Sequence, residues 1–333
     1  MNYKTYEFEL NLSNIPNFDI YTSSEISDIS DEYLNNYSNY LKQIISTLDK
    51  DRIVILTIYG GEPFTKIDKL KIFIEQLIGH VDHFCISTYG GGILENWPSI
   101  LNLWNKLSNT FSIKLHWSDQ NNDLFWKIFT KLFSRHLVSG FSTRISSSNI
   151  EKLPFLINNF IDNVYTTQRT TLRRLNLFVS FNKSEYSNFD KGEIEKILQE
   201  SVDIINSSDI ITNDDIVYYN KLNYLGDTNK ILLDCMTIDG SIYVGCDTPV
   251  MSDYGLTNCK VGHISENIDT LLEKRNNFKL NNSIDLTTLD DYHKLFLSTP
   301  KIEFSDTGID KINEQPFTEA YELHELFQKY FNK

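Results

Sequence analysis

Short apolar runs and amphipathic segments take turns along the first 180 residues. Residues 6–12 alternate between polar and apolar side chains, which is the pattern of a half-buried strand. Residues 53–58 (Ile-Val-Ile-Leu-Thr-Ile) form a continuous β-branched run, typical of a parallel strand covered on both faces. Further strands are predicted at residues 82–88, 111–116, 140–146 and 172–181. The pattern thus predicts six strands in this region.

The segments between the predicted strands have apolar residues at helical spacing. Three of these helices have a capping residue in the expected place: Ser30 before a helix that starts near residue 31, Thr65 before 67–78, and Asn149 before a helix that ends near residue 161. Two more helices are predicted at 98–107 and 123–133. Five βα units followed by a sixth strand require a parallel sheet with right-handed crossovers. The periodicity leaves open whether this sheet is open or curled into a barrel.

After residue 182 the alternation of strands and helices breaks down. Polar stretches flank a helix predicted at 192–205, and residues 231–246 are predicted to form a β-hairpin around Asp239-Gly240. A last helix is predicted at 318–331. The chain is therefore divided into a core domain at 1–182, a connecting region at 183–230 and a C-terminal region at 231–333.

The composition of the 333-residue chain, with 41% hydrophobic and 23% charged residues, is that of a globular protein. Its formal net charge of −14 disfavours nucleic acids and anionic membranes as partners, because the average surface repels both. The one compact basic run, residues 169–174, is interpreted as solvated surface or salt bridges. No segment approaches the roughly 20 apolar residues of a membrane span, and residues 1–10 lack the apolar core of a signal peptide. We therefore expect a cytoplasmic protein with no membrane partner.

Four cysteines in a chain of this length do not form a disulfide framework. Cys85 lies within an apolar predicted strand and is interpreted as core packing. The other three cysteines, Cys235, Cys246 and Cys259, lie close together in the C-terminal region. This grouping needs a separate explanation.

The turn Gly60-Gly61-Glu62-Pro63 directly follows the predicted strand at 53–58. It resembles the turn after the second strand of radical S-adenosylmethionine (radical SAM) enzymes, whose backbone binds the methionyl amino group of the cofactor. Three other places agree with this resemblance: Thr88-Tyr89-Gly90 after strand three, His116-Trp117-Ser118-Asp119 after strand four, and Asn149 after strand five. The resemblance covers residues 5–180 or so and implies an α/β fold, the partial (βα)6 TIM-like barrel of the radical SAM type with a small α+β C-terminal extension.

The resemblance fails where the family binds its catalytic iron–sulfur cluster. Family members carry Cys-x-x-x-Cys-x-x-Cys after strand one, often with Asn-Phe behind the first cysteine. Aligning Asn17-Phe18 with that pair puts Pro16, Ile20 and Ser23 at the three cysteine positions. Proline and isoleucine offer no ligand atom, and serine is a poor substitute for the thiolates that hold clusters. The segment is either a decayed cluster loop or a loop that never held cysteines, and the agreement around it favours decay.

The C-terminal cysteines resemble a reduced form of the auxiliary-cluster extension called SPASM or twitch. In that extension one cysteine precedes an Asp-Gly hairpin, a second follows it, and a Gly-Asn-Ile-like segment introduces a helix. Here Cys235 and Cys246 bracket the hairpin, and Cys259 precedes Gly262-His263-Ile264. The candidate metal ligands are therefore Cys235, Cys246, Cys259 and His263. Three interpretations stay open: no metal, a structural zinc in a Cys3His set, or an auxiliary iron–sulfur cluster.

The candidate cofactor-binding residues are Gly60, Gly61, Glu62 and Pro63. They bind S-adenosylmethionine or another nucleotide if the resemblance extends to the ligand. Otherwise they serve the turn itself, because glycine permits positive φ and proline suits the entry to a helix. The second glycine-rich turn, residues 89–92, either approaches a phosphate or ribose closely or is a flexible loop.

Three polar residues are expected near the carboxyl ends of the predicted strands, where α/β barrels have their active sites: Glu62, Asp119 and Arg144. His116 is either an acid–base group, since the ordinary pKa of histidine lies near neutrality, or a hydrogen-bonded structural residue. An aromatic stripe at helical spacing is interpreted as core or interface packing and not as a cofactor site; it comprises Trp104, Phe125, Trp126, Phe129 and Phe133.

Two hypotheses follow for the function. The first is a pseudoenzyme: a radical SAM-fold protein that has lost its catalytic cluster and serves as a binding or partner protein for a peptide or protein. Only the likeness to SPASM/twitch proteins, many of which modify peptides, suggests that class of partner. The second is a diverged radical SAM or SAM-binding enzyme that modifies a peptide and has an iron–sulfur or zinc site in its C-terminal region. No cysteine occurs in residues 1–84, which disfavours the radical version.

Overall fold

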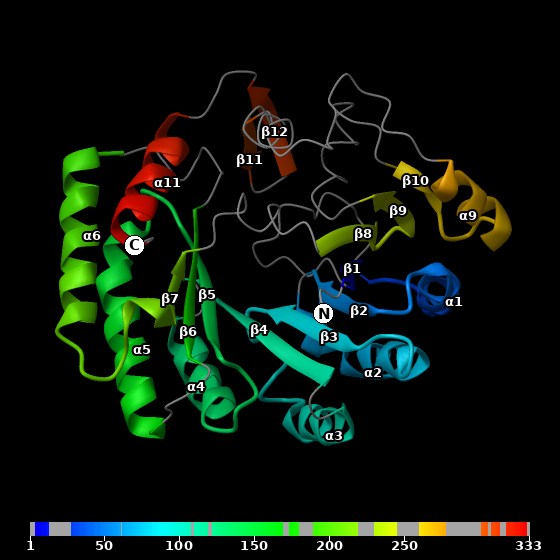
Figure 1. Ribbon diagram of the computed structural model, residues 1–333, viewed down its shortest axis with the longest axis horizontal. Helices are drawn as coiled ribbons and strands as arrows, with labels where there is room; N and C mark the ends of the chain where they lie inside the picture. Colours follow the sequence, from blue (N-terminus) through cyan, green and yellow to red (C-terminus); the bar gives the residue numbers. More distant parts are fainter. Residues whose placement is uncertain are drawn as a thin grey trace. The chain divides into compact units, whose positions relative to one another are not determined.

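The chain forms a mixed α/β structure with a largely parallel sheet (Figure 1). The computed structural model describes residues 4–12, 28–60, 62–107, 110–118, 122–168, 173–179, 189–218, 230–244, 260–277, 301–305, 308–313 and 318–331. None of the helices in these ranges is long and apolar enough to cross a membrane.

The strands are β1 (Lys4–Asn11), β2 (Arg52–Tyr59), β3 (His83–Thr88), β4 (Phe111–Trp117), β5 (Gly140–Ile145), β6 (Arg174–Val179), β7 (Ile216–Tyr218), β8 (Lys230–Met236), β9 (Ser241–Val244), β10 (Lys260–His263), β11 (Lys301–Ser305) and β12 (Gly308–Asn313). The α-helices are α1 (Asp31–Thr47), α2 (Ile67–Leu77), α3 (Trp97–Leu107), α4 (Asn122–Phe133), α5 (Leu153–Thr167), α6 (Lys191–Asn206), α9 (Ile268–Asn276) and α11 (Thr318–Phe331). The five predicted βα units, the sixth strand, the hairpin and the last helix are all confirmed within a few residues.

Ten strands follow the order β10-β9-β8-β1-β2-β3-β4-β5-β6-β7, and β11 pairs with β12 in a separate two-stranded sheet. The chain divides into two compact units. The first unit comprises Met1–Lys114 and Asp227–Asp285, and the second comprises Leu115–Gly226 and Leu286–Lys333. The boundary between them falls inside β4, and each unit combines two segments that are distant in the sequence. The three-part division of the chain into 1–182, 183–230 and 231–333 stays a prediction.

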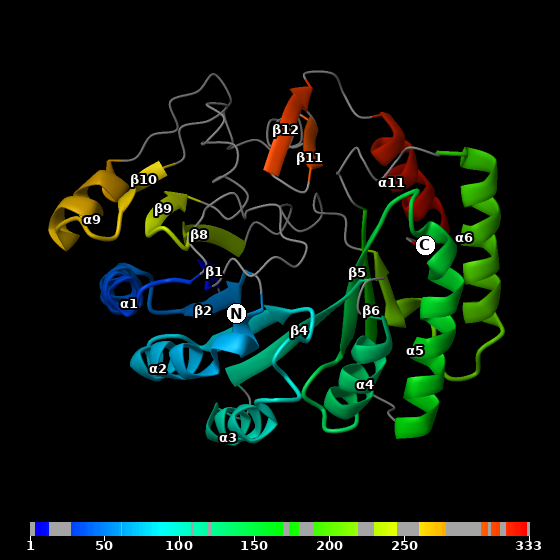
Figure 2. The same cartoon turned by 180° about the vertical axis from the view of Figure 1, so that it is seen from behind.

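In the first unit β1, β2 and β3 run parallel and in sequence order, with Leu10 opposite Ile58 and Ile58 opposite Ile86. Right-handed crossovers between strands that advance in one direction put the connecting helices on the same face of a sheet. In both views α1 and α2 lie side by side along these strands (Figure 1, Figure 2). Tyr37 of α1 stacks on Phe73 of α2, with ring centroids 6.3 Å apart.

These three strands therefore have two unlike faces, because alternate side chains point to opposite sides. One face is apolar and buried; it comprises Tyr6, Phe8, Leu10, Val54, Leu56, Ile58, Phe84 and Ile86. The other face is largely polar, and most of its side chains are half-exposed; it includes Glu7, Glu9, Asn11, Thr57, Tyr59, His83, Cys85 and Ser87. The expectation that residues 53–58 are covered on both faces is wrong, since burial alternates along β2 and Ile53 is 38% exposed. Among the described residues, helices are found on one side of these strands.

Strands β8, β9 and β10 extend the first unit beyond β1. β8 runs parallel to β1, and β9 and β10 follow antiparallel. The predicted turn at Asp239-Gly240 is confirmed: Gly240 has a φ of +85°, and a Cβ there would lie 2.9 Å from His263 Nε2. The helix expected after Gly262-His263-Ile264 is α9, whose N-cap Asn267 accepts hydrogen bonds from two backbone N–H groups.

The second unit has an aromatic core between α4, β5 and α5. Phe125, Phe129 and Phe133 of α4 are fully buried. Phe129 meets Phe141 of β5 edge to face at 5.2 Å, and Phe133 lies 6.2 Å from Phe160 of α5. The interpretation of this stripe as packing is confirmed for α4. β7, next to β6, was not predicted, and α11 packs against it through the stacked pair Phe327 and Tyr218.

Of the three predicted helix caps, one is confirmed and two are wrong. Ser30 caps α1 as expected, because its side chain accepts a hydrogen bond from Tyr33 N at 3.0 Å. Thr65 does not cap α2, since a 3-10 turn at Pro63–Lys66 precedes that helix and makes Lys66 its N-cap. The Thr65 hydroxyl instead donates to the backbone oxygen of Glu62.

Asn149 is likewise no helix cap. A 3-10 turn at Ile150–Lys152 precedes α5, and the Asn149 side chain makes no capping hydrogen bond there. Its Oδ1 accepts from Ser146 N at 2.9 Å and its Nδ2 donates to Arg144 O, so the side chain closes the turn after β5.

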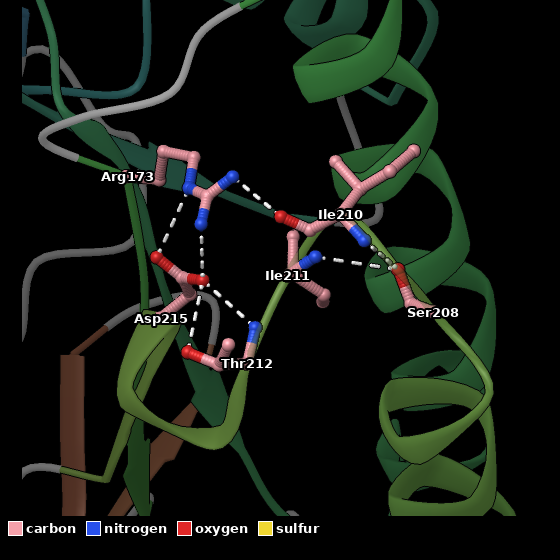
Figure 3. A network of polar contacts seen from close by, with 6 residues as sticks. All are labelled: Arg173, Ser208, Ile210, Ile211, Thr212 and Asp215. Carbon is pink, nitrogen blue, oxygen red and sulfur yellow. Dashed lines mark hydrogen bonds and ion pairs between the residues drawn. The ribbon is translucent and has the colours of Figure 1, made fainter.

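The basic run at 169–174 contributes an internal ion pair to the second unit (Figure 3). Arg173 donates from Nε and Nη2 to the two carboxylate oxygens of Asp215, at 3.2 and 2.9 Å, and also to Ile210 O. The same carboxylate accepts from the backbone and hydroxyl of Thr212. Arg174 is exposed. The salt-bridge interpretation is therefore confirmed for Arg173, and Arg169 lies outside the described residues.

Candidate functional site

The polar face of β1, β2 and β3 is the candidate site of the first unit. Strand register places Glu9 beside Thr57 and Thr57 beside Cys85, and it places Asn11 beside Tyr59. These rows lie toward the carboxyl ends of parallel strands, which is where α/β proteins bind ligands. The apolar face cannot serve this purpose because it is buried.

Several side chains on this polar face bind one another. Thr57 donates to the Glu7 carboxylate at 2.8 Å. The Tyr59 hydroxyl lies 3.2 Å from the Sγ atom of Cys235 in β8. β1 lies between β2 and β8 in the sheet, so the Tyr59 side chain reaches across β1 to make this contact. The site is thus an ordered array of carboxylate, hydroxyl, thiol and amide groups.

Asn11 is a member of this array with a buried acceptor that has no partner among the described residues. The residue is 1% exposed, and its Oδ1 atom meets no hydrogen-bond donor in the part of the chain that the structure describes. Leaving a buried acceptor unpaired costs about 1–3 kcal/mol, and most buried polar groups in proteins are paired. Asn11 therefore needs an explanation beyond the stability of the fold.

Glu62 forms a second polar cluster at the carboxyl ends of β2 and β3. Its side chain is 2% exposed and points into the turn after β3. Its carboxylate accepts from the Thr88 hydroxyl at 2.6 Å and from Tyr89 N at 3.1 Å. Gly90 and Gly91 also approach it with backbone N–H groups. The second glycine-rich turn is therefore wrapped around a carboxylate of the same chain.

This arrangement explains the glycines of residues 89–92 without a phosphate or ribose. A Cβ at Gly91 would lie 2.7 Å from Glu62 Cγ, and Gly92, with a φ of +75°, would place one 2.7 Å from Thr65 N. Gly90 has a φ of +105°, a conformation that glycine adopts readily. The turn is built around Glu62, which argues against a flexible loop.

Burial raises the pKa of Glu62 to about 7, although the hydrogen bonds from Thr88 and the turn oppose this shift. The carboxyl group therefore gains and loses its proton near neutral pH. Because its acceptor oxygens organise the turn, its charge state is linked to the order of residues 89–92.

The motif Gly60-Gly61-Glu62-Pro63 is thus accounted for in part by the fold. Gly60 has a φ of +91°, Glu62 is used inside the chain, and Pro63 is the buried first residue of a 3-10 turn. Gly61 lies outside the described residues. The binding of S-adenosylmethionine at this turn stays a prediction.

A buried ion pair holds the hairpin and α9 against α1. Asp234 of β8 is 1% exposed, and its Oδ2 accepts from Tyr40 of α1 at 2.7 Å and from Arg275 of α9 at 2.6 Å. Tyr37 donates to the backbone oxygens of Glu9 and Asp234. Burial raises the pKa of Asp234, although Arg275 and Tyr40 act to lower it.

The C-terminal candidate ligands are only partly within the described residues. Cys235 is fully buried beside Tyr59. His263 uses both ring nitrogens in the hairpin: Nε2 lies 2.6 Å from Asp239 O, and Nδ1 lies 2.7 Å from Ser265 Oγ. A metal at His263 would have to displace one of these contacts, so this conformation does not fit a Cys3His zinc set. Cys246 and Cys259 lie outside the described residues.

The remaining candidates are spread over the two units. His116 of β4 lies opposite Ser142 in the second unit, and Arg144 is exposed on β5 of that unit. Asp119 lies outside the described residues. Cys85 is half-exposed on the polar face, so the interpretation as core packing is wrong. Groups of three or more His, Cys, Asp or Glu side chains able to hold a metal are not found in the described part of the chain.

Sequence reasoning missed Asn11, Tyr59, Asp234 and Arg275, although a signal existed for two of them. Residues 6–11 alternate strictly between apolar and polar types, which already puts Asn11 on a polar face with Glu7 and Glu9. Asp234 interrupts the apolar run 231–236, and a lone charge in a buried strand requires a partner. The partner itself, 41 residues away, cannot be read from spacing.

The residues that would hold a catalytic iron–sulfur cluster do not fit that group. The aligned positions Pro16, Ile20 and Ser23 lie outside the described residues, and their side chains supply no thiolate. In comparisons with known proteins, the chain matches no family model and no curated sequence.

Proposed function

We propose that this chain is a radical SAM-fold protein without a catalytic cluster that binds a peptide or protein on the polar face of β1, β2 and β3. The observation that carries the proposal is that face itself: a half-exposed array of polar side chains on parallel strands whose other face is covered by helices.

The arrangement of the strands supports a sheet of the barrel type. An open doubly wound sheet has helices on both faces and binds its ligand where the strand order reverses. In the first unit β1, β2 and β3 advance without reversal, as β4 to β7 do in the second. A sheet wound in one direction leaves one face free of crossover helices. A partial (βα)6 barrel would have such a face on its inside.

The chemistry of the ligand set supports binding over radical catalysis. A cluster of this kind is held by cysteine thiolates, and the aligned positions offer proline, isoleucine and serine. The polar face of β1 to β3 has carboxylates, hydroxyls and an amide, which are the groups that bind peptide amides and charged side chains. The net charge of −14 favours such a partner over nucleic acid.

Anaerobic iron–sulfur reconstitution tests the cluster half of the proposal. We expect the wild type to bind no cluster at residues 16–23, so a Cys235→Ser/Cys246→Ser/Cys259→Ser variant should hold no iron. A Pro16→Cys/Ile20→Cys/Ser23→Cys variant should gain about four iron atoms per chain and absorb at about 400 nm, because the thiolates are restored. Iron content and visible absorption measure both outcomes.

The alternative, an enzyme with a C-terminal iron–sulfur or zinc site, predicts different results. It requires metal in the wild type that the triple serine variant loses, together with a thermal shift on adding S-adenosylmethionine. Four irons in the triple serine variant would contradict the proposed loss of the catalytic cluster. A restored-cysteine variant that folds and takes up no iron would contradict the alignment on which that loss rests.

Selection of peptides from a random display library tests the binding half. We expect peptides that bind the wild type and an Ile72→Arg variant but not a Ser87→Arg variant. Ser87 lies on the polar face of β3, whereas Ile72 is 58% exposed on α2 and serves as the matched control. Equal binding to both arginine variants would remove this face as the site.

A further inference from the structure

We propose that Asn11 is the centre of a subsite for a primary ammonium group of the bound peptide, supplied by a lysine side chain or by the peptide's N-terminus. This inference rests on the proposed function and names the chemical group that the polar face recognises. It follows from three features of the first unit: a buried unpaired acceptor, its position and the charge around it.

The unpaired acceptor calls for a hydrogen-bond donor. Asn11 is 1% exposed, and its Oδ1 has no hydrogen-bond partner among the residues that the structure describes. Asn96, by comparison, donates from Nδ2 to Phe64 O and Gly92 O at 3.0 and 3.1 Å. Most buried amide oxygens have a partner in the protein or in ordered water, and we assign the partner of this one to a donor group of the bound ligand. The missing partner is therefore a donor group and not an acceptor.

The position of Asn11 is that of a ligand-binding residue. It is the last residue of β1, and its register partner Tyr59 is the last residue of β2. The Tyr59 hydroxyl, 3.2 Å from Cys235 Sγ, reaches over β1 on the same face. Ligands of parallel sheets bind at the carboxyl ends of the strands. A donor that reached Asn11 Oδ1 would approach from this end.

The charge along β1, β2 and β3 favours a cation. Their polar face carries the carboxylates of Glu7 and Glu9, on the same strand and the same side as Asn11. That face holds no lysine or arginine in these three strands. A phosphate or carboxylate would meet like charge there, which is unfavourable at short range.

An ammonium group suits this arrangement better than a guanidinium. Arginine binds best to a single carboxylate through two parallel hydrogen bonds. Here the acceptor is one amide oxygen, and the carboxylates belong to separate residues two and four positions away in β1. One of the three independent donors of an ammonium group can meet the amide oxygen, while the carboxylates of Glu7 and Glu9 attract its charge from a greater distance.

Three small probes test the subsite by calorimetric titration of the full chain. N-acetyl-lysine methylamide offers a side-chain ammonium, norleucinamide offers an α-ammonium, and N-acetyl-norleucine methylamide offers neither. We expect at least one ammonium probe to bind tenfold or more tightly than the neutral probe. The stronger of the two identifies the source as a lysine side chain or an N-terminus. Equal affinity for all three probes would overturn the inference.

Variants at Asn11 separate binding from folding. Asn11→Leu keeps the branching of the side chain and removes the amide, so ammonium binding should fall at least tenfold. Its Tm should fall less than that of Asn96→Leu, because the leucine removes an acceptor that has no partner among the described residues. Asn11→Asp should bind the ammonium probe at least as well as the wild type. If the leucine variant fails to fold, the affinity of Asn11→Asp is the measurement that tests the inference. Weaker binding by Asn11→Asp would overturn the inference.

The control Asn96→Leu should behave in the opposite way. Its amide is paired within the chain, so the variant should have a lower Tm and unchanged affinity for the ammonium probe. A Tm lowered by Asn11→Leu as much as by Asn96→Leu would mean that the Asn11 acceptor has a partner within the fold, which overturns the inference. Selected peptides that bind on the polar face without any requirement for an amine would overturn it too, but would leave the proposed function standing.

Discussion

Replacing Asp234 by leucine is expected to lower the free energy of unfolding by about 3–5 kcal/mol, the range measured when one partner of a buried ion pair is removed. The Arg275 guanidinium would lose its carboxylate, and the Tyr40 hydroxyl would lose its acceptor. Tyr40 is fully buried and the Arg275 side chain is 21% exposed, so water could replace the lost partner only in part. Urea denaturation at neutral pH measures the loss.

Replacing both partners should cost much less than replacing one. Burial raises the pKa of Asp234 in spite of Arg275, which means that the carboxylate loses more by leaving water than the arginine returns. In Asp234→Leu/Arg275→Met neither charge is left buried and unpaired, so most of the stability should return. In a double-mutant cycle, the double variant should therefore lose less stability than the sum of the losses in Asp234→Leu and Arg275→Met.

The exposed pair Lys4–Asp49 is the matched control. Its side chains are 54% and 60% exposed, and the nitrogen–oxygen distance is 3.0 Å. Asp49→Ala should lower the free energy of unfolding far less than Asp234→Leu does, because surface ion pairs contribute little. A loss at Asp234 no larger than at Asp49 would show that Asp234 does not anchor the hairpin. If the double variant were no more stable than Asp234→Leu, the loss of stability could not be explained by the unpaired charge of Arg275.

The elements of the fold follow closely from the periodicity of the sequence. α1 begins after the predicted cap Ser30, and the bounds of α11 agree with the predicted 318–331. Local signals suffice there because each helix buries one apolar stripe. The misjudged caps at Thr65 and Asn149 have one cause: a 3-10 turn precedes each helix, and capping patterns do not distinguish the two kinds of turn.

Elements that depend on pairing were harder to predict. β7 has three residues, Ile216–Tyr218, too few for a period of two to be visible. In β11 Ile302 and Phe304 alternate with polar residues, but the apolar residues of β12, Ile309 and Ile312, are three positions apart, so no period of two marks the pair. The pairing of β8 with β1 joins residues more than 200 positions apart, and no local pattern encodes such a contact.

The glycine-rich turn of the candidate site could be predicted from the sequence, whereas the side-chain contacts within the site could not. The sequence places Glu62 in a turn in which glycine is expected to adopt a positive φ, and Gly60 has a φ of +91°. It could not show that the carboxylate points into the turn after β3, because that contact joins Glu62 to Tyr89 across two strands. The array around Asn11 likewise depends on the register of β1 with β2.

Replacing Glu62 by glutamine is expected to remove a pH dependence of stability worth about 3 kcal/mol between pH 4.5 and 7, since each pKa unit corresponds to about 1.4 kcal/mol. Burial raises the pKa of Glu62 from its ordinary 4.5 to about 7. Between these values the unfolded chain has released the proton and the folded chain still holds it. The wild type therefore loses stability as the pH rises through this window, and the curve is flat above it.

The stability of wild type minus that of Glu62→Gln isolates this one group from the other acids of the chain. The difference should fall by about 3 kcal/mol from pH 4.5 to pH 7.5. Glu75→Gln is the control with the opposite sign, because its hydrogen bond from Lys106 lowers the pKa of Glu75. The stability that Glu75 contributes is present above pH 4.5 and is lost as the pH falls. Denaturant unfolding measures both differences when the pH series runs from 7.5 to below 4.5, because the Glu75 contribution changes only below 4.5.

Amide hydrogen exchange at Tyr89 links this titration to the candidate site. Opening of the turn exposes Glu62 to water, where its pKa returns toward the ordinary 4.5, so opening becomes easier as the pH rises toward about 7. Protection of the Tyr89 amide, whose N–H donates to the Glu62 carboxylate, should therefore fall through this window and level off above it, after correction for the intrinsic exchange rate. Glu62→Gln should show no such step. A step of equal size in that variant would assign the titration to another group and separate the order of this turn from Glu62.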